Sequence, residues 1–304
     1  KEMKRLVLLD SHAILHRAYH ALPDFASKKG EPTGALYGLV AMLIKIIEEL
    51  KPDYLVACYD LPGPTYRHDV YKEYKAQRKK MEDDLAVQIN RSRDIFKAFG
   101  VPIYDKAGFE ADDMLGTIVE KTKNNSSIQV VIASGDMDTL QLVQDEKVLV
   151  YTLKKGIRDT ILYDEEAVKT RFGFGPELLP DYKGLRGDPS DNIIGISGIG
   201  EKTATILITE FGGIENIYKE LEKGSGQEKD DEKNEGEKKI KGKDSKKIKV
   251  KTKEKEKKES SLDGDYEKFK KAGISPRIIE LLINGKEEAE FSKMLATIRR
   301  DAPI

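Results

Sequence analysis

Three short apolar runs, each followed closely by an acidic residue, most strongly constrain the fold of this chain. They cover residues 5–10 (RLVLLD), 54–60 (YLVACYD) and 128–134 (IQVVIAS), and the third leads into Asp136 and Asp138. Continuous runs of β-branched and aliphatic residues are typical of strands buried on both faces of a parallel sheet. The sequence therefore predicts such a sheet, with acidic residues at the carboxyl ends of its strands.

Helical periodicity separates these predicted strands. Apolar residues recur every three or four positions over 36–50, 85–99 and 111–123, and Pro52 and Gly100 mark the ends of the first two helices. Strands therefore alternate with helices along the chain. The predicted fold class is α/β, with a central, mostly parallel sheet flanked by helices.

Acidic residues are crowded in two short motifs. Glu110, Asp112 and Asp113 lie in GFEADD, and Asp136 and Asp138 lie in SGDMD. Carboxylates this close repel one another, and a hard divalent cation with oxygen ligands offsets the repulsion. Since ligands bind beyond the carboxyl ends of parallel strands, we expect a metal site there that also includes the acids ending the first two strands, Asp10 and Asp60. A helix cap or a solvated surface group is the alternative for any single acid.

Residues 66–80 form a basic stretch with interleaved tyrosines. On a helix, Tyr71, Lys75 and Arg78 would share one face. Aromatic rings that stack on bases, next to cations that hold phosphates, suit a path for single-stranded nucleic acid. A solvated helix whose tyrosines cover the core is the alternative, and these residues alone slightly favour it.

A glycine-rich segment lies between two acids and a predicted helix. Asp188 and Asp191 precede GISGIG (residues 195–200), and a helix should start near Lys202. Glycines allow close approach of the backbone, and amides at a helix start can hold a phosphate. A Walker loop does not fit, because Glu201 separates the last glycine from Lys202. A helix-hairpin-helix that grips a nucleic acid backbone without reading its sequence fits better.

One run of unusual composition lies inside the predicted helical unit and does not mark a domain boundary. Residues from about 222 to 260 are almost all Lys, Glu, Asp and Gly, and cannot bury enough apolar surface to offset their ordering entropy. We therefore expect a disordered insertion that acts as a solvated spacer. The alternative is that its basic second half contacts nucleic acid nonspecifically. The predicted domains are an α/β core at 1–175 and a helical DNA-binding subdomain at 176–304.

Composition bounds the remaining function classes. The net charge of −1 argues neither for nor against nucleic acid as a partner. The apolar runs are strand-sized, so we expect no signal peptide, no membrane span and a cytoplasmic location. The single cysteine, Cys58, falls inside the second predicted strand and indicates a small core residue rather than redox chemistry.

Taken together, the motifs resemble the 5′-nuclease (flap endonuclease) family, and most of all the 5′→3′ exonuclease domain at the amino end of bacterial DNA polymerases I. The resemblance runs from about Arg5 to Ile304, apart from the charged run. It implies a PIN-like core with a helical arch at about 64–84 and a C-terminal helix-hairpin-helix (H3TH) subdomain. The matching motifs are LD at 9–10, YD at 59–60, FEADD at 109–113, GDMD at 135–138, GDPSDN at 187–192 and GIGEKTA at 198–204.

This resemblance implies a role for each matching residue. Lys75 and Arg78 would be catalytic, contacting the scissile phosphate, and Tyr74 would stack on a base near the cut. A potassium ion bound by backbone carbonyls would help the hairpin to hold the duplex. Two Mg²⁺ or Mn²⁺ ions would be held by Asp10, Asp60, Glu110, Asp112, Asp113, Asp136, Asp138, Asp188 and Asp191. DNA would be contacted by Arg67, Tyr74, Lys183, Arg186, Gly198, Gly200, Lys202 and Thr203.

The implied activity is that of a structure-specific 5′→3′ exonuclease and 5′-flap endonuclease. It would hydrolyse DNA, and RNA in RNA–DNA hybrids, by two-metal-ion catalysis in primer removal and DNA repair. Expected partners are DNA with a 5′ flap, nick or gap and polymerase domains of the same chain. The protein would be a monomer located at the bacterial nucleoid. The alternatives are a catalytically silent module that binds DNA junctions and a PIN-like ribonuclease.

The two ends of the chain lead to one more expectation. The chain starts at Lys1 without a methionine and stops at Ile304, about where polymerase I proteins pass into their next domain. We therefore expect a fragment of a longer protein, with a freestanding exonuclease as the alternative.

Overall fold

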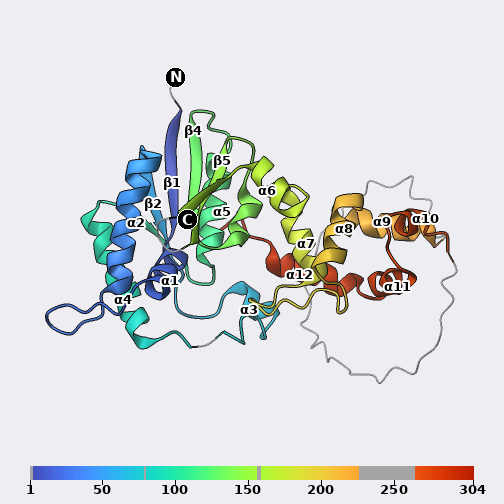
Figure 1. Cartoon of the computed structure of the whole chain (residues 1–304), viewed down its shortest axis with the longest axis horizontal. Coiled ribbons are helices and arrows are strands. Elements are labelled where there is room, and N and C mark those ends of the chain that lie inside the picture. Colours follow the sequence, from blue (N-terminus) through green and yellow to red (C-terminus); the bar gives the residue numbers. More distant parts are fainter. Residues whose placement is uncertain (1–2, 79, 156–158, 226–263) are drawn as a thin grey trace.

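The computed structural model describes residues 3–78, 80–155, 159–225 and 264–304. A six-stranded sheet with helices on both faces lies beside a group of shorter helices (Figure 1). The order of the strands is β3-β2-β1-β4-β5-β6, and every neighbouring pair is parallel except β5 with β6. This confirms the predicted class. The strands are β1 (Lys4–Asp10), β2 (Tyr54–Cys58), β3 (Ile103–Tyr104), β4 (Ile128–Ser134), β5 (Val148–Lys155) and β6 (Asp159–Tyr163).

The register of the sheet brings the acidic strand ends together. Asp10 lies opposite Cys58 on β2, and Leu9 lies opposite Ala133 on β4. Because parallel strands end at the same edge, the segments that follow β1, β2 and β4 all leave the sheet there. Those segments carry Asp10, Asp60 and the pair Asp136 and Asp138.

Each face of the sheet is covered by its own layer of helices. Val7 and Leu9 pack with residues of the helices on one face, and Leu6 and Leu8 pack with α5 on the other, as alternation along a strand requires. All four side chains are buried, which explains the continuous apolar run of β1. The first layer contains α1 (Ser11–Ala21), α2 (Gly34–Leu50) and α4 (Asp83–Ala98), and the second contains α5 (Ala111–Thr122).

The helical part continues the second layer without a break in its core. Residues from the sheet, from α5 and from these helices belong to one hydrophobic cluster. The last helix returns toward the sheet and packs along α7 (Figure 1). The α-helices are α6 (Glu165–Phe172), α7 (Leu179–Arg186), α8 (Glu201–Phe211), α9 (Ile214–Gly224), α10 (Glu267–Lys271), α11 (Pro276–Asn284) and α12 (Lys286–Ala296), with 3-10 turns at Met137–Leu142 and Pro176–Leu178.

The three helices predicted in the core are confirmed as α2, α4 and α5, whereas the expected long helix over 66–80 is wrong. Only α3 (Tyr66–Val70) is helical there, and turns follow it. Lys75 has φ of 55°, in the left-handed region, which a continuous α-helix of L-residues cannot contain. The predicted common face of Tyr71, Lys75 and Arg78 therefore does not exist.

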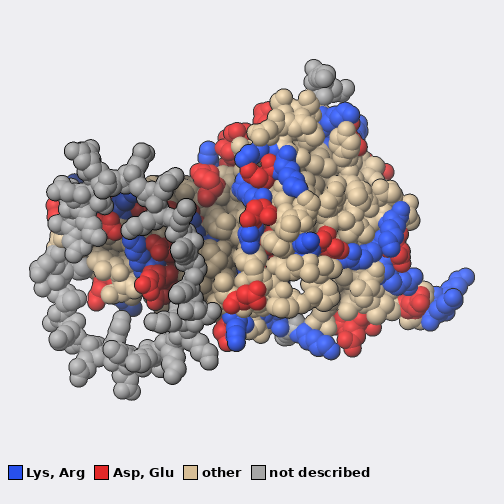
Figure 2. Space-filling view, turned by 180° about the vertical axis from the view of Figure 1, so that it is seen from behind, with Lys and Arg blue, Asp and Glu red and all other residues tan. Residues whose placement is uncertain are grey.

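The predicted insertion at 222–260 starts too early, because α9 continues to Gly224. The rest of that prediction, over residues 226–263, lies outside the described residues. Among the ranges that the structure describes, no helix combines the length and the apolar character needed to cross a bilayer. Figure 2 shows one face of the molecule, on which basic and acidic side chains are interspersed.

Candidate active site

A pocket opens at the carboxyl edge of the sheet, where the acidic strand ends meet. Its acidic wall comes from β1, from the segments after β2 and β4 and from the start of α5. Lys75 and Arg78, from the segment after α3, line it as well. The carboxylates in its wall are Asp10, Asp60, Glu110, Asp112 and Asp136.

Backbone and side-chain donors fix the acids at the strand ends. Asp10 caps α1, accepting from the Ala13 amide at 3.1 Å, and also accepts from the Ser134 hydroxyl at 2.6 Å. Asp60 accepts from the amide of Ala111 at 2.7 Å. Sequence reasoning missed Ser134, although its place at the end of β4, opposite the β1 acid, was the signal that could have found it.

Crowding of these carboxylates shows in their pKa values. Burial, together with the charges of Asp60 and Asp136, raises the pKa of Asp10 to about 7. Burial and the charges of Asp136 and Asp10 also raise the pKa of Asp112 well above its usual range. Asp112 accepts no hydrogen bond from any residue in the described part of the chain. The repulsion between Asp10, Asp112 and Asp136 is therefore only partly offset, and a cation bound among them would relieve it.

A second group of acids surrounds Lys183 of α7. The Lys183 ammonium donates to Asp138 and, at 2.6 Å, to Asp188. Burial raises the pKa of Asp138 to about 6, although Lys183 opposes the shift. For Asp188, Lys183 and the donors of Ser190 outweigh burial and lower the pKa to about 2. Lys183 thus connects the helical part to the segment after β4 through Asp138, and its bond to Asp188 stays within the helical part.

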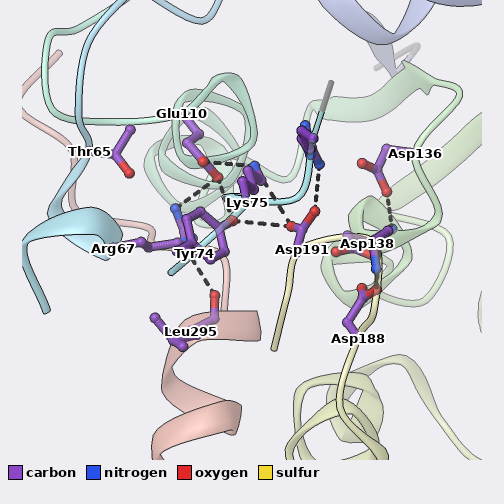
Figure 3. A network of polar contacts seen from close by, with 12 residues as sticks. Thr65, Arg67, Tyr74, Lys75, Glu110, Asp136, Asp138, Asp188, Asp191 and Leu295 are labelled. Carbon is purple, nitrogen blue, oxygen red and sulfur yellow. Dashed lines mark hydrogen bonds and ion pairs between the residues drawn. The ribbon is translucent and has the colours of Figure 1, made fainter. Parts of the chain in front are cut away.

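The basic residues of the expected arch are held by acids in the same way. Lys75 donates to Glu110 at 2.8 Å and lies 3.7 Å from Asp191, and Arg78 donates to Asp191 at 2.5 Å. The Tyr74 hydroxyl lies 3.2 Å from an oxygen of Glu110 and 3.1 Å from one of Asp191, and its single proton is shared between these two acceptors (Figure 3). Both predicted catalytic cations therefore form ion pairs across the pocket.

Two predicted DNA contacts need correction for this conformation. The side chain of Tyr74 is covered, with 3% of the residue exposed, so its ring offers no face for a base to stack on. Arg67 is 2% exposed, and its guanidinium pairs with Asp113 through two hydrogen bonds of 2.9 Å each. Because a buried and fully paired guanidinium cannot reach a phosphate, Arg67 has a structural role instead.

Asp113 must also be removed from the metal ligands. Its two oxygens accept four hydrogen bonds, two from Arg67, one from the Glu110 amide at 3.0 Å and one from the Arg299 amide at 2.9 Å. A carboxylate has about four lone-pair sites, so none is left for a cation. Breaking a buried pair such as Arg67 with Asp113 costs about 3–5 kcal/mol, because one charge stays buried without its partner.

The glycine hairpin has the backbone geometry that its sequence requires. Gly195 has φ of 65°, and a Cβ atom there would lie 2.2 Å from the amide nitrogen of Gly187, so only glycine fits. Gly198 is also in the left-handed region, with φ of 94°, and Gly200 is the N-cap residue of α8. Lys202, in the first turn of α8, is exposed to solvent.

The other predicted hairpin contacts lie close by. Thr203 is half-buried in the first turn of α8. Arg186 packs over the ring of Tyr182 and lies 3.9 Å from Glu201. The hairpin therefore presents backbone and basic side chains on one side of the helical part.

The carboxylate oxygens of the pocket are suitable ligands for a divalent cation, but they do not form a preformed coordination site. Within the ranges that the structure covers, no group of three or more His, Cys, Asp or Glu side chains could hold a metal ion as it stands. Lys75 and Lys183 each take up carboxylate oxygens that a cation could otherwise use. A cation that binds to Glu110, Asp138 or Asp188 would therefore compete with these ammonium groups.

The overall fold is that of a known class of exonuclease. The chain is similar to a solved structure of T5 5′-exonuclease with bound zinc ions, with a TM-score of 0.65 and 20% sequence identity. The similarity covers 96% of this chain and 89% of that chain.

The sequence identifies the family. Residues 5–173 match the model of the 5′-3′ exonuclease N-terminal, resolvase-like domain, and residues 174–304 match that of the 5′-3′ exonuclease C-terminal SAM fold. The chain therefore belongs to the 5′-3′ exonuclease family, as its motifs predicted.

Curated relatives differ in how much of their length this chain covers. DNA polymerase I of Bacillus caldotenax is 35% identical over 301 residues, which are 99% of this chain but 28% of the relative. A 5′-3′ exonuclease of Aquifex aeolicus is 39% identical over 221 residues, 73% of this chain and 74% of the relative. The chain thus spans about a quarter of the polymerase I relatives that it matches.

Proposed function

We propose that this chain is a metal-dependent 5′→3′ exonuclease and 5′-flap endonuclease. Its substrates would be DNA with a 5′ flap, nick or gap, and RNA hybridised to DNA, in primer removal and excision repair. The observation that carries the proposal is the pocket of crowded carboxylates with Lys75 and Arg78 in its wall.

Seven carboxylates are the proposed metal ligands, and Asp191 would join them once Arg78 and Tyr74 release it. Two Mg²⁺ or Mn²⁺ ions bound there would activate water and neutralise charge on the phosphate. The raised pKa values of Asp10, Asp112 and Asp138 support this, because burial and neighbouring like charges disfavour their ionised forms, and a bound cation would offset both effects. The seven are Asp10, Asp60, Glu110, Asp112, Asp136, Asp138 and Asp188.

Lys75 and Arg78 would act on the substrate directly. In the free protein their partners are Glu110 and Asp191. Metal binding at these acids would release both side chains, which could then hold the scissile phosphate and stabilise the charge that develops on it. The proposed catalytic cations would therefore become available only when the acids are neutralised.

The hairpin would hold the duplex beside the cut. Gly198, Gly200, Lys202 and Thr203 are proposed phosphate contacts, with a potassium ion on the hairpin carbonyls. Further proposed contacts are Lys183 and Arg186, the second of which lies 3.9 Å from Glu201. Backbone contacts of this kind read no sequence, which suits selection by substrate shape. We further propose a monomer at the bacterial nucleoid, with polymerase domains in the same chain.

Incubation with a 5′-labelled flap duplex, with and without Mg²⁺, tests the proposal. The wild type should cut near the base of the flap only in Mg²⁺, Asp138→Ala should abolish cutting and Lys75→Ala should slow it. Tight binding without cleavage in Mg²⁺ or Mn²⁺ would instead identify a junction-binding module. A preference for unstructured RNA over flapped DNA would identify a PIN-like ribonuclease.

A further inference from the structure

The buried Arg67 joins three parts of the chain that are distant in sequence. Its Nε donates to the carbonyl of Leu295 at 3.0 Å, and Nη2 donates to the carbonyl of Thr297 at 2.9 Å (Figure 3 shows Arg67 beside Leu295). The guanidinium also makes two bonds to Asp113 and one, of 3.2 Å, to Oε2 of Glu110. These five bonds use all five of its N–H donors.

The end of α12 and the residues after it lead onto α5, and we call residues 295–302 the C-terminal strap. The Arg299 amide donates to Asp113 at 2.9 Å, and the Ala302 amide donates to the hydroxyl of Thr117 at 3.0 Å. The strap thus follows α5 from its first turn onward. Since α12 packs on α7, the strap connects the helical part to the start of α5, where Glu110 is the N-cap residue.

There is no spare room between the strap and α5. A Cβ atom on Gly116 would lie 2.6 Å from the carbonyl oxygen of Arg299 and 2.7 Å from the side chain of Ile298. On its other side, the strap is held by Gln141, whose side chain donates to the Ala296 carbonyl and accepts from the Ile298 amide. The strap is therefore held between α5 and Gln141, and a methyl group added at Gly116 would force it or α5 to shift.

The two oxygens of Glu110 have different partners. Oε2 accepts from Arg67 and from Tyr74, and Oε1 accepts from Lys75. Arg67 is buried with every donor used, whereas Lys75 is partly exposed and lies in the segment of turns after α3. Oε1 is therefore the oxygen that can exchange its partner, and Arg67 sets the direction in which it points.

We propose that Arg67 is a positioning residue of the metal site. Its planar fork orients Glu110 for a cation and ties that orientation to the seating of the C-terminal strap, and so to the helical part that would hold DNA. The inference rests on the proposed function, because it takes Glu110 as a metal ligand. The predicted effect of removing Arg67 is opposite to that of its charge alone. Loss of a positive charge next to acids would strengthen cation binding, whereas loss of the orientation of Glu110 would weaken it.

A charge-conserving substitution separates the two effects. Lysine keeps the charge of Arg67, but its three donors on a single atom cannot serve five acceptors in the geometry of a planar fork. Gly116→Ala alters the contact between α5 and the C-terminal strap. The added methyl group must displace the strap or α5, and it touches no carboxylate. Arg91→Lys is the matched control, since Arg91 pairs with Glu31 on the surface.

The test is calorimetric titration of Mn²⁺ into the DNA-free protein. Arg67→Lys should bind Mn²⁺ about 10- to 100-fold more weakly than the wild type, as expected when a residue that orients a metal ligand is changed. Gly116→Ala should weaken binding in the same direction, and Arg91→Lys should leave it unchanged. Thermal melting of each variant, without metal, reports whether it is folded.

Each result decides the proposal. Wild-type Mn²⁺ affinity in folded Arg67→Lys would overturn it. If Arg67→Lys does not fold, Gly116→Ala decides, and wild-type affinity in that variant would overturn the proposal as well. If the wild type itself does not bind Mn²⁺, the proposed function and this inference are both overturned. If the wild type binds Mn²⁺ and the variants bind it with the same affinity, only the inference is overturned.

Discussion

The two walls of the acidic pocket are positioned by different means. Asp10 and Asp60 accept hydrogen bonds from the backbone of helices that begin at the sheet edge, so the fold itself places them. Lys75 and Arg78 come from a segment of turns and form their ion pairs with Glu110 and Asp191. The acids are thus a property of the fold, whereas the position of the cations depends on the charge state of the acids.

The two walls should therefore respond differently when metal binds. Neutralising the acids with metal would leave the sheet unchanged but would remove the partners that hold the cations. The account therefore predicts a rigid metal site and a basic segment that changes position. The experiments below test that contrast, beginning with the largest expected effect.

Loss of one acid from the fixed wall should have the greatest effect on activity. Asp112→Asn should slow cleavage of a flap duplex by about 10³-fold, since several kcal/mol of charge stabilisation are lost. It should not lower the melting temperature in EDTA, because it removes a charge that its neighbours repel. Single-turnover kinetics and thermal melting measure the two effects, with Asp94→Asn at an exposed site as the control. Equal losses of activity and stability would show a structural role instead.

Loss of a basic side chain from the other wall should lower activity without weakening metal binding. Lys75→Met should slow cleavage by about 10²-fold, as for removal of one group that stabilises transition-state charge. The same variant should bind Mn²⁺ at least as tightly as the wild type, because it frees an oxygen of Glu110. Kinetics and calorimetry test this, with exposed Lys72→Met as the control. Weaker Mn²⁺ binding would mean that Lys75 organises the acids rather than competing for them.

The stability of the metal-free protein should depend on pH through the fixed wall. The pKa of Asp10 is about 7 in the folded protein against an ordinary value of 3.8, and that of Asp138 is about 6. These two carboxyl groups bind more protons in the folded than in the unfolded state, so stability should rise as pH falls from 8 to about 6.5, by on the order of 1 kcal/mol. Below that range His12 and His16, whose pKa values burial lowers, oppose the rise.

Thermal melting in EDTA and in Mg²⁺ measures this dependence. Mg²⁺ at pH 8 should raise the melting temperature and flatten its dependence on pH, because metal replaces the protons. A melting temperature in EDTA that stays constant over the same pH range would contradict the proposed crowding of these carboxylates.

The smallest effect is expected far from both walls, at the hairpin. Lys202→Ala should weaken binding of a flap duplex only a few-fold and reduce the slope of log K against log salt by about one, the signature of one lost phosphate contact. Binding titrations at several salt concentrations measure this slope. Lys271→Ala, on α10, is the control and should leave the slope unchanged. An unaltered slope in Lys202→Ala would remove Lys202 from the duplex contact.

Local patterns were enough to predict three of the six strands and the acidic edge that they form, whereas β3, β5 and β6 were not predicted. β1 is buried on both faces, so its sequence is continuously apolar, and its register with β2 and β4 follows from parallel pairing. Asp10 and Asp60 lie at the strand ends for the same reason. Nothing beyond strand periodicity and the positions of the acids was needed.

Contacts between distant parts of the chain account for what the sequence could not predict. Asp113 looks equivalent to Asp112 in the motif FEADD, but its partners include Arg299, which is 186 residues away. The amide of Lys75 donates to the carbonyl of Asp191 at 2.9 Å, and this contact with the hairpin takes the place of the helix that periodicity suggested. No local pattern reveals either contact.

Crystals of the DNA-free protein soaked in Mn²⁺ would test the central claim most directly, through anomalous scattering from the bound ions. The account predicts Mn²⁺ among Asp10, Asp112 and Asp136, an unchanged position of these three side chains, and a Lys75 ammonium that has moved away from Glu110. Mn²⁺ bound elsewhere, or bound there while Lys75 keeps its ion pair with Glu110, would contradict the claim that metal and arch cations compete for the same acids.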